Sequence, residues 1–177
     1  MPDTARLFFA LWPDDAVREA LADLARSLQQ QCAGRVIPAH NIHLTLVFLG
    51  NVAAGRIPDL HALAAAIAAP PVDLTVDALN YWRHNRIVWA GTGACPEALS
   101  TLVMQLTGAL PRAGFRCEDR PYAPHITLLR DARHAPAANA IAGIAWRARE
   151  FALVQSVRQH GAVYYQVIAH WPLAATR

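Results

Sequence analysis

The residues best suited to chemistry are two histidines, each followed two positions later by a threonine. His43 and Thr45 lie in the stretch NIHLTLVFLG, and His125 and Thr127 lie in PHITLLR. Side chains at i and i+2 of a strand point to the same face, so each histidine shares a face with its threonine. If the two strands face each other, two imidazoles and two hydroxyls converge on one space.

This set of groups suits phosphoryl transfer. A neutral imidazole can take a proton from an attacking oxygen, and an imidazolium can give one to the departing oxygen, because the ordinary pKa of histidine is near 6.5. Threonine hydroxyls can donate hydrogen bonds to phosphate oxygens as charge develops there. Such a site needs neither a metal nor a nucleotide cofactor when the substrate is a strained 2′,3′-cyclic phosphate.

A single His-x-Thr in a strand is more often structural than functional, but these two occupy equivalent points of an internal repeat. The first copy reads RLFFA, a helical stretch at 14–31 and then HLTL; the second reads RIVWA, a helical stretch at 96–110 and then HITL. We therefore expect an α+β protein of two lobes related by a pseudo-two-fold axis. Each lobe would be an antiparallel-type sheet with helices on its outer face, and the cleft between the lobes would hold the site.

Hydrophobic periodicity and turn residues place the elements that must position these groups. We expect each strand to pack its apolar face on the helix of its own lobe. A third helix is expected at 55–69, and the segment 131–145 is the most loop-like. The expected strands are 6–12, 42–49, 72–79, 86–90, 125–130, 149–157 and 162–170.

Composition indicates one globular unit. The 177 residues are 54% hydrophobic and 16% charged, with a net charge of +3, so we expect a single two-lobed domain over 1–177 that buries a core without a metal or disulfide. The three cysteines show no metal-binding or disulfide spacing. No stretch is typical of a signal peptide or a membrane span, and we expect a cytoplasmic monomer.

The paired motifs and their flanking words resemble the 2H phosphoesterases, and more closely the bacterial and archaeal RNA 2′,3′-cyclic phosphodiesterases, also called 2′-5′ RNA ligases. The matching stretches are RLFFAL at 6–11, NIHLTLVFLG at 41–50, RIVWAG at 86–91 and RPYAPHITLLRDA at 120–132. The resemblance spans nearly the whole chain. It implies a partner RNA that ends in a 2′,3′-cyclic phosphate, with no cofactor and no metal.

The resemblance also implies a role for each residue of the site. His43 would be the proton donor to the leaving 3′ oxygen, and His125 the proton acceptor that activates water to give a 2′-phosphate end. Thr45 and Thr127 would hold the phosphate. Run in reverse with a 5′-hydroxyl, the same site would join RNA ends through a 2′-5′ linkage without ATP. The residues alone do not decide which histidine is the acid.

Two further residues are candidate substrate contacts. Arg130 could pair with phosphate, although strict alternation from His125 places it on the opposite face of the strand. Tyr122 stands between prolines beside the second motif and could stack on a base. Phe9 and Trp82 are weaker candidates, and core packing is the expected role of Phe9.

Other histidines lack a threonine at i+2, and no compact ligand spacing supports a zinc site. Two rival functions stay open. One is a phosphodiesterase for another cyclic phosphodiester, such as an ADP-ribose cyclic phosphate or a 2′-5′ oligonucleotide. The other is a non-catalytic RNA-end-binding module, against which the presence of both His-Thr pairs argues.

Overall fold

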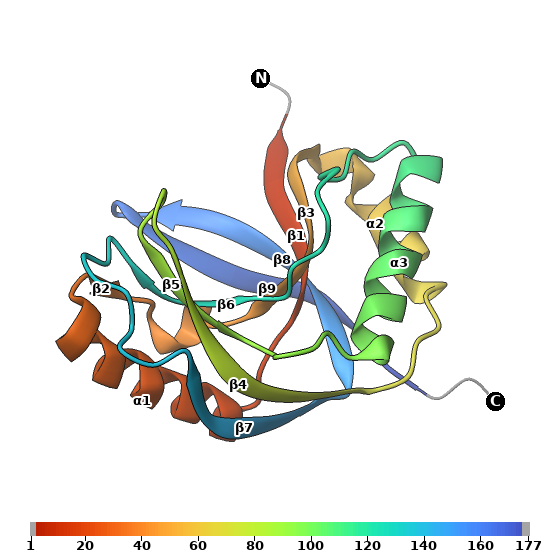
Figure 1. Ribbon diagram of the computed structural model, residues 1–177. Helices are drawn as coiled ribbons and strands as arrows, with labels where there is room; N and C mark the ends of the chain where they lie inside the picture. The colour runs from red at the N-terminus through yellow and green to blue at the C-terminus, as the bar shows by residue number, and fades with distance from the viewer. Residues whose placement is uncertain (1–2, 175–177) are drawn as a thin grey trace.

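The computed structural model describes residues 3–174, which form two antiparallel sheets and three α-helices (Figure 1). The four-stranded sheet has the order β3-β1-β8-β9, and the five-stranded sheet has the order β2-β6-β5-β4-β7. The strands of the first sheet are β1 (Thr4–Leu11), β3 (Leu44–Ala53), β8 (Glu150–Gln159) and β9 (Ala162–Pro172). Those of the second are β2 (Arg35–Val36), β4 (Val72–Trp82), β5 (Ile87–Gly91), β6 (Ile126–Arg130) and β7 (Ala140–Ala148).

The helices follow their sequence signals. Helix α1 (Asp15–Cys32) begins where the Asp14 carboxylate accepts a hydrogen bond from the Val17 amide at 2.9 Å, which satisfies one of the free amides of the first turn. Its apolar stripe is buried. Helix α3 (Glu97–Arg112) follows Pro96, and helix α2 (Ile57–Ala65) has a proline in its first turn, where no amide partner is lost.

The two halves of the repeat form the centres of the two sheets. Strands β1 and β3 of the first copy pair in one sheet, and β5 and β6 of the second copy pair in the other. The expected α+β architecture of two antiparallel lobes is confirmed.

The expectation that each strand packs on the helix of its own lobe is wrong for α1. Helix α1 lies mainly on β2, β6 and β7, and α3 lies on β3 and β4 (Figure 1). Antiparallel neighbours need no crossover on one face of their sheet, so the connecting helix is free to cross to the other sheet. Each lobe is therefore covered in part by the helix of the other copy.

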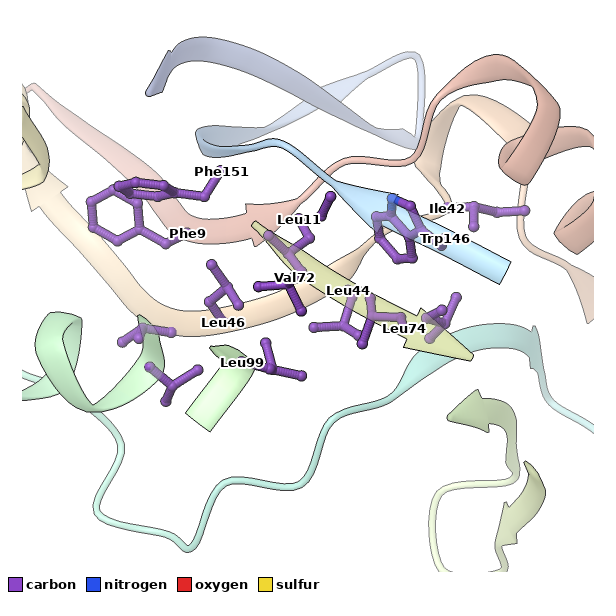
Figure 2. Close-up of a cluster of buried hydrophobic side chains, with 14 of the residues drawn as sticks. Phe9, Leu11, Ile42, Leu44, Leu46, Val72, Leu74, Leu99, Trp146 and Phe151 are labelled. Carbon is purple, nitrogen blue, oxygen red and sulfur yellow. The ribbon is translucent and has the colours of Figure 1, made fainter. Parts of the chain in front are cut away.

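Side chains from both sheets and from the helices form one large buried cluster (Figure 2). Its largest members include Phe9 of β1 and Phe151 of β8, whose ring centroids lie 6.0 Å apart. Leu44 and Leu46 of β3 belong to the same cluster as Leu99 of α3. The apolar face of each motif strand is thus fixed in the core, which leaves its His-Thr face turned away.

A second, smaller buried cluster lies on the other face of the four-stranded sheet. It consists of Phe8, Ala10, Ala152 and Val154. The sheet is therefore apolar on both faces near its centre, and this second cluster forms a firm base beneath the cavity described below.

Two elements differ from the sequence-based expectations. The segment expected to be loop-like contains the start of β7, and the two-residue strand β2 was not predicted. Strand β7 pairs only with β4 and exposes one face, and its alanines and glycine are poor strand formers. No helix within residues 3–174 is long and apolar enough to cross a membrane.

Candidate active site

One cavity of about 230 Å³ brings together the residues singled out by the two motifs. His43 directly precedes β3, and His125 directly precedes β6, so each histidine stands at the end of a strand from a different sheet. Both histidines line the cavity with their i+2 threonines, Thr45 and Thr127, and so does Arg130. The convergence predicted from the alternation of side chains is present.

The imidazole of His43 is held at both nitrogens. Nδ1 donates to the Asn41 carbonyl at 2.7 Å, because a carbonyl can only accept. In the neutral ring Nε2 then carries the lone pair, and the Thr45 hydroxyl lies 3.0 Å from it as a donor. This arrangement fixes which nitrogen faces the cavity.

Three aromatic rings surround the imidazole of His43. Trp12 stacks on it at 5.5 Å and 9°, Phe8 lies at 4.9 Å, and Tyr165 meets it edge-on at 5.0 Å. Burial lowers the pKa of His43 to about 4; the hydrogen bond to Asn41 opposes this shift, and the charges of His125 and Arg130 add to it. The ring is therefore neutral at pH 7 in the free protein.

His125 has a related but more open setting. Its Nδ1 donates to the Ala123 carbonyl at 2.9 Å, and Trp82 packs against the ring at 4.6 Å. Burial is the main cause of the lowered pKa of His125, and the positive charges of Arg130 and Arg120 lower this pKa further. The hydrogen bond to the Ala123 carbonyl and the negative charge of Glu118 oppose the shift. Both histidines present Nε2 toward the cavity as a proton acceptor.

Bulges explain how Arg130 reaches the cavity despite the alternation rule. In the pairing of β6 with β5, Thr127 lies opposite Trp89 and Leu129 lies opposite Val88, so β6 carries one extra residue, Leu128. An extra residue reverses the alternation beyond it. The side chain at 130 therefore returns to the face of Thr127.

The first motif has the same irregularity. Thr45 lies opposite Ala10, and Val47 lies opposite Phe9, so Leu46 is an extra residue of β3; a second register shift follows at Leu49. The following Phe48 lines the cavity, as Arg130 does in the second copy. The bulge directly after the motif threonine is thus shared by both halves, and the side chain that it brings to the cavity differs.

Asn41 is the one buried polar residue identified within the described chain. Its side-chain amide donates to the Val163 carbonyl at 2.8 Å, and its side-chain oxygen accepts from the Tyr165 amide at 3.1 Å. Its backbone carbonyl receives the Nδ1 proton of His43. Asn41 therefore connects the start of β9 to the orientation of the histidine.

Tyr122 lies beside the cavity and not in its lining. Its hydroxyl donates to the Thr45 carbonyl at 3.0 Å, and burial raises its pKa. With Trp82 it lines a neighbouring hollow of about 450 Å³, which shares Thr45, Phe48 and His125 with the cavity. Phe9 is fully buried in the core, as expected.

Several residues of the cavity were missed by reading the sequence. The two motifs indicate only β3 and β6, whereas side chains of β1, β8 and β9 also line the cavity. The strand alternation of RLFFA could have indicated Arg6 and Phe8, which precede the first helix on a common face. The additional residues are Arg6, Phe8, Ile37, Asn41, Phe48, Ser156 and Tyr165.

The histidines without a threonine at i+2 are not among the residues that line the cavity. His40 stacks on Tyr164, and His61 meets Trp171 edge-on. Across residues 3–174, no three His, Cys, Asp or Glu side chains gather in a way that could hold a metal ion.

Comparison with known proteins shows which family the chain is similar to. The model of the LigT-like phosphoesterase family matches residues 11–89 and 92–164, and each stretch contains one of the two motifs. The RNA 2′,3′-cyclic phosphodiesterase of Escherichia coli K12 is 36% identical over 175 residues, which is 98% of this chain and 99% of that protein. The enzyme of the same name from Thermus thermophilus is 32% identical over 90% of this chain and is covered over 86% of its own length.

Solved structures agree with the sequence matches. Escherichia coli LigT complexed with 3′-AMP superposes with a TM-score of 0.87 at 35% identity, covering 98% of this chain and all of that one. The protein TT0787 of Thermus thermophilus superposes with a TM-score of 0.80 at 28% identity, covering 97% of this chain and all of that one. With the family model matching both halves and full-length relatives above 30% identity, the chain belongs to the LigT-like phosphoesterases.

Proposed function

We propose that this protein hydrolyses RNA 2′,3′-cyclic phosphate ends to 2′-phosphates, with His43 as proton donor and His125 as proton acceptor. The observation that carries the proposal is the shared cavity: two histidines from different sheets, each with its threonine, stand around one space. The relatives named RNA 2′,3′-cyclic phosphodiesterase support the choice of substrate.

In the proposed reaction, Nε2 of His125 takes a proton from water as its oxygen bonds to phosphorus. The bond from phosphorus to the 3′ oxygen breaks, and His43 gives that oxygen a proton. Each acid–base role contributes typically about 10²–10⁴-fold to the rate. Hydrogen bonds hold both imidazoles in place before substrate arrives, so little reorganisation of these two groups accompanies the reaction.

The assignment of His125 as acceptor is supported by access. The neighbouring hollow reaches His125 but does not include His43 in its lining. Water, or the 5′-hydroxyl of a second RNA in the reverse ligation, can approach through this hollow. His43 is enclosed by aromatic rings, a setting that suits a group which meets only the bound substrate.

A proton donor must be charged, yet His43 is neutral in the free protein at pH 7. A phosphodiester anion placed in a buried cavity favours the charged imidazolium and raises its pKa. Substrate binding therefore brings a proton to Nε2 of His43. The Thr45 hydroxyl, which donates to that nitrogen in the free state, is then released to donate to a phosphate oxygen.

Product analysis on an oligonucleotide that ends in a 2′,3′-cyclic phosphate tests the proposal. We expect a 2′-monophosphate product, and activity that persists in EDTA. A 3′-monophosphate product would contradict the assignment of the leaving group. Loss of activity in EDTA that zinc restores would favour a metal hydrolase.

The two rival functions have distinct outcomes in the same assay. Faster turnover of an ADP-ribose cyclic phosphate or a 2′-5′ oligonucleotide would favour the first rival. Inertness toward every cyclic diester, together with tight binding of RNA ends, would favour the non-catalytic module. A monomeric state and a cytoplasmic location stay predictions, and light scattering of the purified protein tests the first.

A further inference from the structure

We propose that Arg6 and Ser156 form a second phosphate-binding subsite, which takes the phosphodiester linkage on the 5′ side of the terminal nucleotide. The inference rests on the proposed function and extends it from the reacting phosphate to the next one along the chain. It makes the preferred substrate an oligonucleotide and not a nucleoside 2′,3′-cyclic phosphate.

The guanidinium of Arg6 lies over an aromatic ring at the cavity. Its guanidinium carbon lies 4.8 Å from the centroid of the Phe48 ring, and both residues line the cavity. A guanidinium on an aromatic face is held in place while its N–H edges remain open to a ligand. No ion pair of Arg6 is found within residues 3–174.

Comparison of the two copies of the repeat shows that only Arg6 directs its guanidinium to the cavity; its counterpart in the second copy does not. Arg86 stands at the corresponding place in the second copy, before IVWA where Arg6 precedes LFFA. The guanidinium of Arg86 pairs with Asp131 at 3.3 Å, and Arg86 is not part of the cavity lining. The second copy therefore uses its strand-start arginine in a surface ion pair, whereas the first copy presents it to the cavity.

Ser156 lies directly opposite Arg6 in the register of β1 with β8. Directly opposed residues have Cβ atoms about 4.5–5.5 Å apart, so their side chains can contact one ligand. Ser156 also lines the cavity. A guanidinium and a hydroxyl side by side repeat the chemistry of Arg130 with Thr127, which suits a second phosphate group.

The spacing along β1 separates the two subsites. Phe8 contacts the imidazole of His43, and Arg6 lies two residues earlier on the same face, about 7 Å along the strand. One nucleotide of extended RNA backbone spans a similar length. With the reacting phosphorus between the histidines, this spacing places Arg6 nearer to the next phosphate along the RNA chain than to the reacting one.

The test compares three substrates. They are a nucleoside 2′,3′-cyclic phosphate, a dinucleotide with the same cyclic end, and that dinucleotide with an uncharged methylphosphonate linkage. A charge-assisted contact to the linkage predicts that wild type has about 10–100-fold higher kcat/KM on the charged dinucleotide than on the methylphosphonate. Arg6→Gln should remove this preference by lowering kcat/KM on the charged dinucleotide far more than on the nucleoside or the methylphosphonate. Ser156→Ala should reduce the preference by a smaller factor.

Arg26→Gln is the matched control, because it removes an exposed arginine of α1 that is absent from the cavity lining. It should keep the full preference, which separates a local contact from an effect of net charge. Circular dichroism and thermal unfolding of each variant check the fold. An Arg6→Gln variant whose kcat/KM falls equally on all three substrates, or on none, overturns the subsite.

Failure of the subsite differs from failure of the proposed function. A wild type that turns over the nucleoside and both dinucleotides at similar kcat/KM contradicts the subsite alone. A wild type inert toward every cyclic phosphate contradicts the proposed function, and the subsite with it.

Discussion

Phe48 and Arg130 occupy equivalent positions in the two halves of the molecule. Each stands five residues after a motif histidine, beyond a one-residue bulge, and each lines the cavity. In one half the position binds a guanidinium through an aromatic ring, and in the other it supplies the guanidinium itself. Both halves thereby bring one arginine to the cavity.

Arg130 is predicted to hold the reacting phosphate. Arg130→Ala should lower kcat/KM on RNA 2′,3′-cyclic phosphate ends by about 10–100-fold, because a hydrogen bond to a charged group contributes roughly 1.5–3 kcal/mol. Arg130→Lys should recover only part of the loss, since an ammonium cannot reproduce the planar fork. Arg133→Ala, which alters an exposed arginine that is not among the cavity residues, should be close to wild type in the same steady-state assay.

The buried His43 predicts an acid-sensitive fold. Its folded-state pKa of about 4 lies below the ordinary 6.5, so the stability it contributes is fully present above pH 6.5 and is lost as the pH falls toward 4. Between pH 7 and pH 4 this residue alone should lower the free energy of unfolding by about 3 kcal/mol. Urea unfolding at a series of pH values measures the effect.

His43→Gln is the control for that experiment, because glutamine keeps a polar side chain that does not titrate. The variant should lose much less stability than wild type over the same pH range. Carboxylates and His125 titrate in both proteins, so the difference between the two curves isolates His43. Parallel curves would show that the imidazole is not buried as described.

Asn41 is predicted to act as a positioning residue for His43. Asn41→Ala removes two side-chain hydrogen bonds to β9 and leaves buried partners unsatisfied, which should cost about 1–3 kcal/mol of stability. Because Asn41 connects Tyr165 to the His43 motif, kcat should fall while KM changes little. Asn41→Asp keeps the acceptor to the Tyr165 amide and should be less affected in kcat; equal losses in the two variants would indicate a purely structural role.

Two variants at Tyr122 separate the contribution of its hydroxyl to stability from the contribution of its ring to substrate binding. Tyr122→Phe removes the hydrogen bond to the Thr45 carbonyl and should lower stability by about 1 kcal/mol with a modest loss of rate. If the ring stacks on a base, as the sequence suggested, Tyr122→Leu should raise KM well beyond the phenylalanine variant. Similar KM values for the two variants would limit Tyr122 to supporting β3.

The central features of the fold were predictable because they rest on local patterns. The Asp14 cap, the apolar stripe of α1 and the β-branched runs of the strands identify their elements directly. The packing of α1 on the other copy's sheet was not predictable, because a repeat shows which elements follow one another and not where an antiparallel connection crosses. Strand β7 was missed because alanines and a glycine on an exposed edge give little strand signal.

The candidate site also contains some residues that the sequence predicts and others that depend on how the strands pair. The His-Thr pairs follow from a two-residue period, which any strand obeys. The place of Arg130 depends on the bulge at Leu128, a feature of the pairing with β5 that no single strand reveals. Arg6 and Ser156 meet only because β1 and β8, distant in sequence, pair in one register.

The two-histidine mechanism is tested most directly by single-turnover hydrolysis of an RNA that ends in a 2′,3′-cyclic phosphate, by wild type, His43→Ala and His125→Ala. Two imidazoles acting on one phosphorus predict that each variant loses about 10²–10⁴-fold in rate while the dissociation constant for the RNA changes modestly. A rate in either folded variant that equals that of wild type would contradict the two-histidine mechanism.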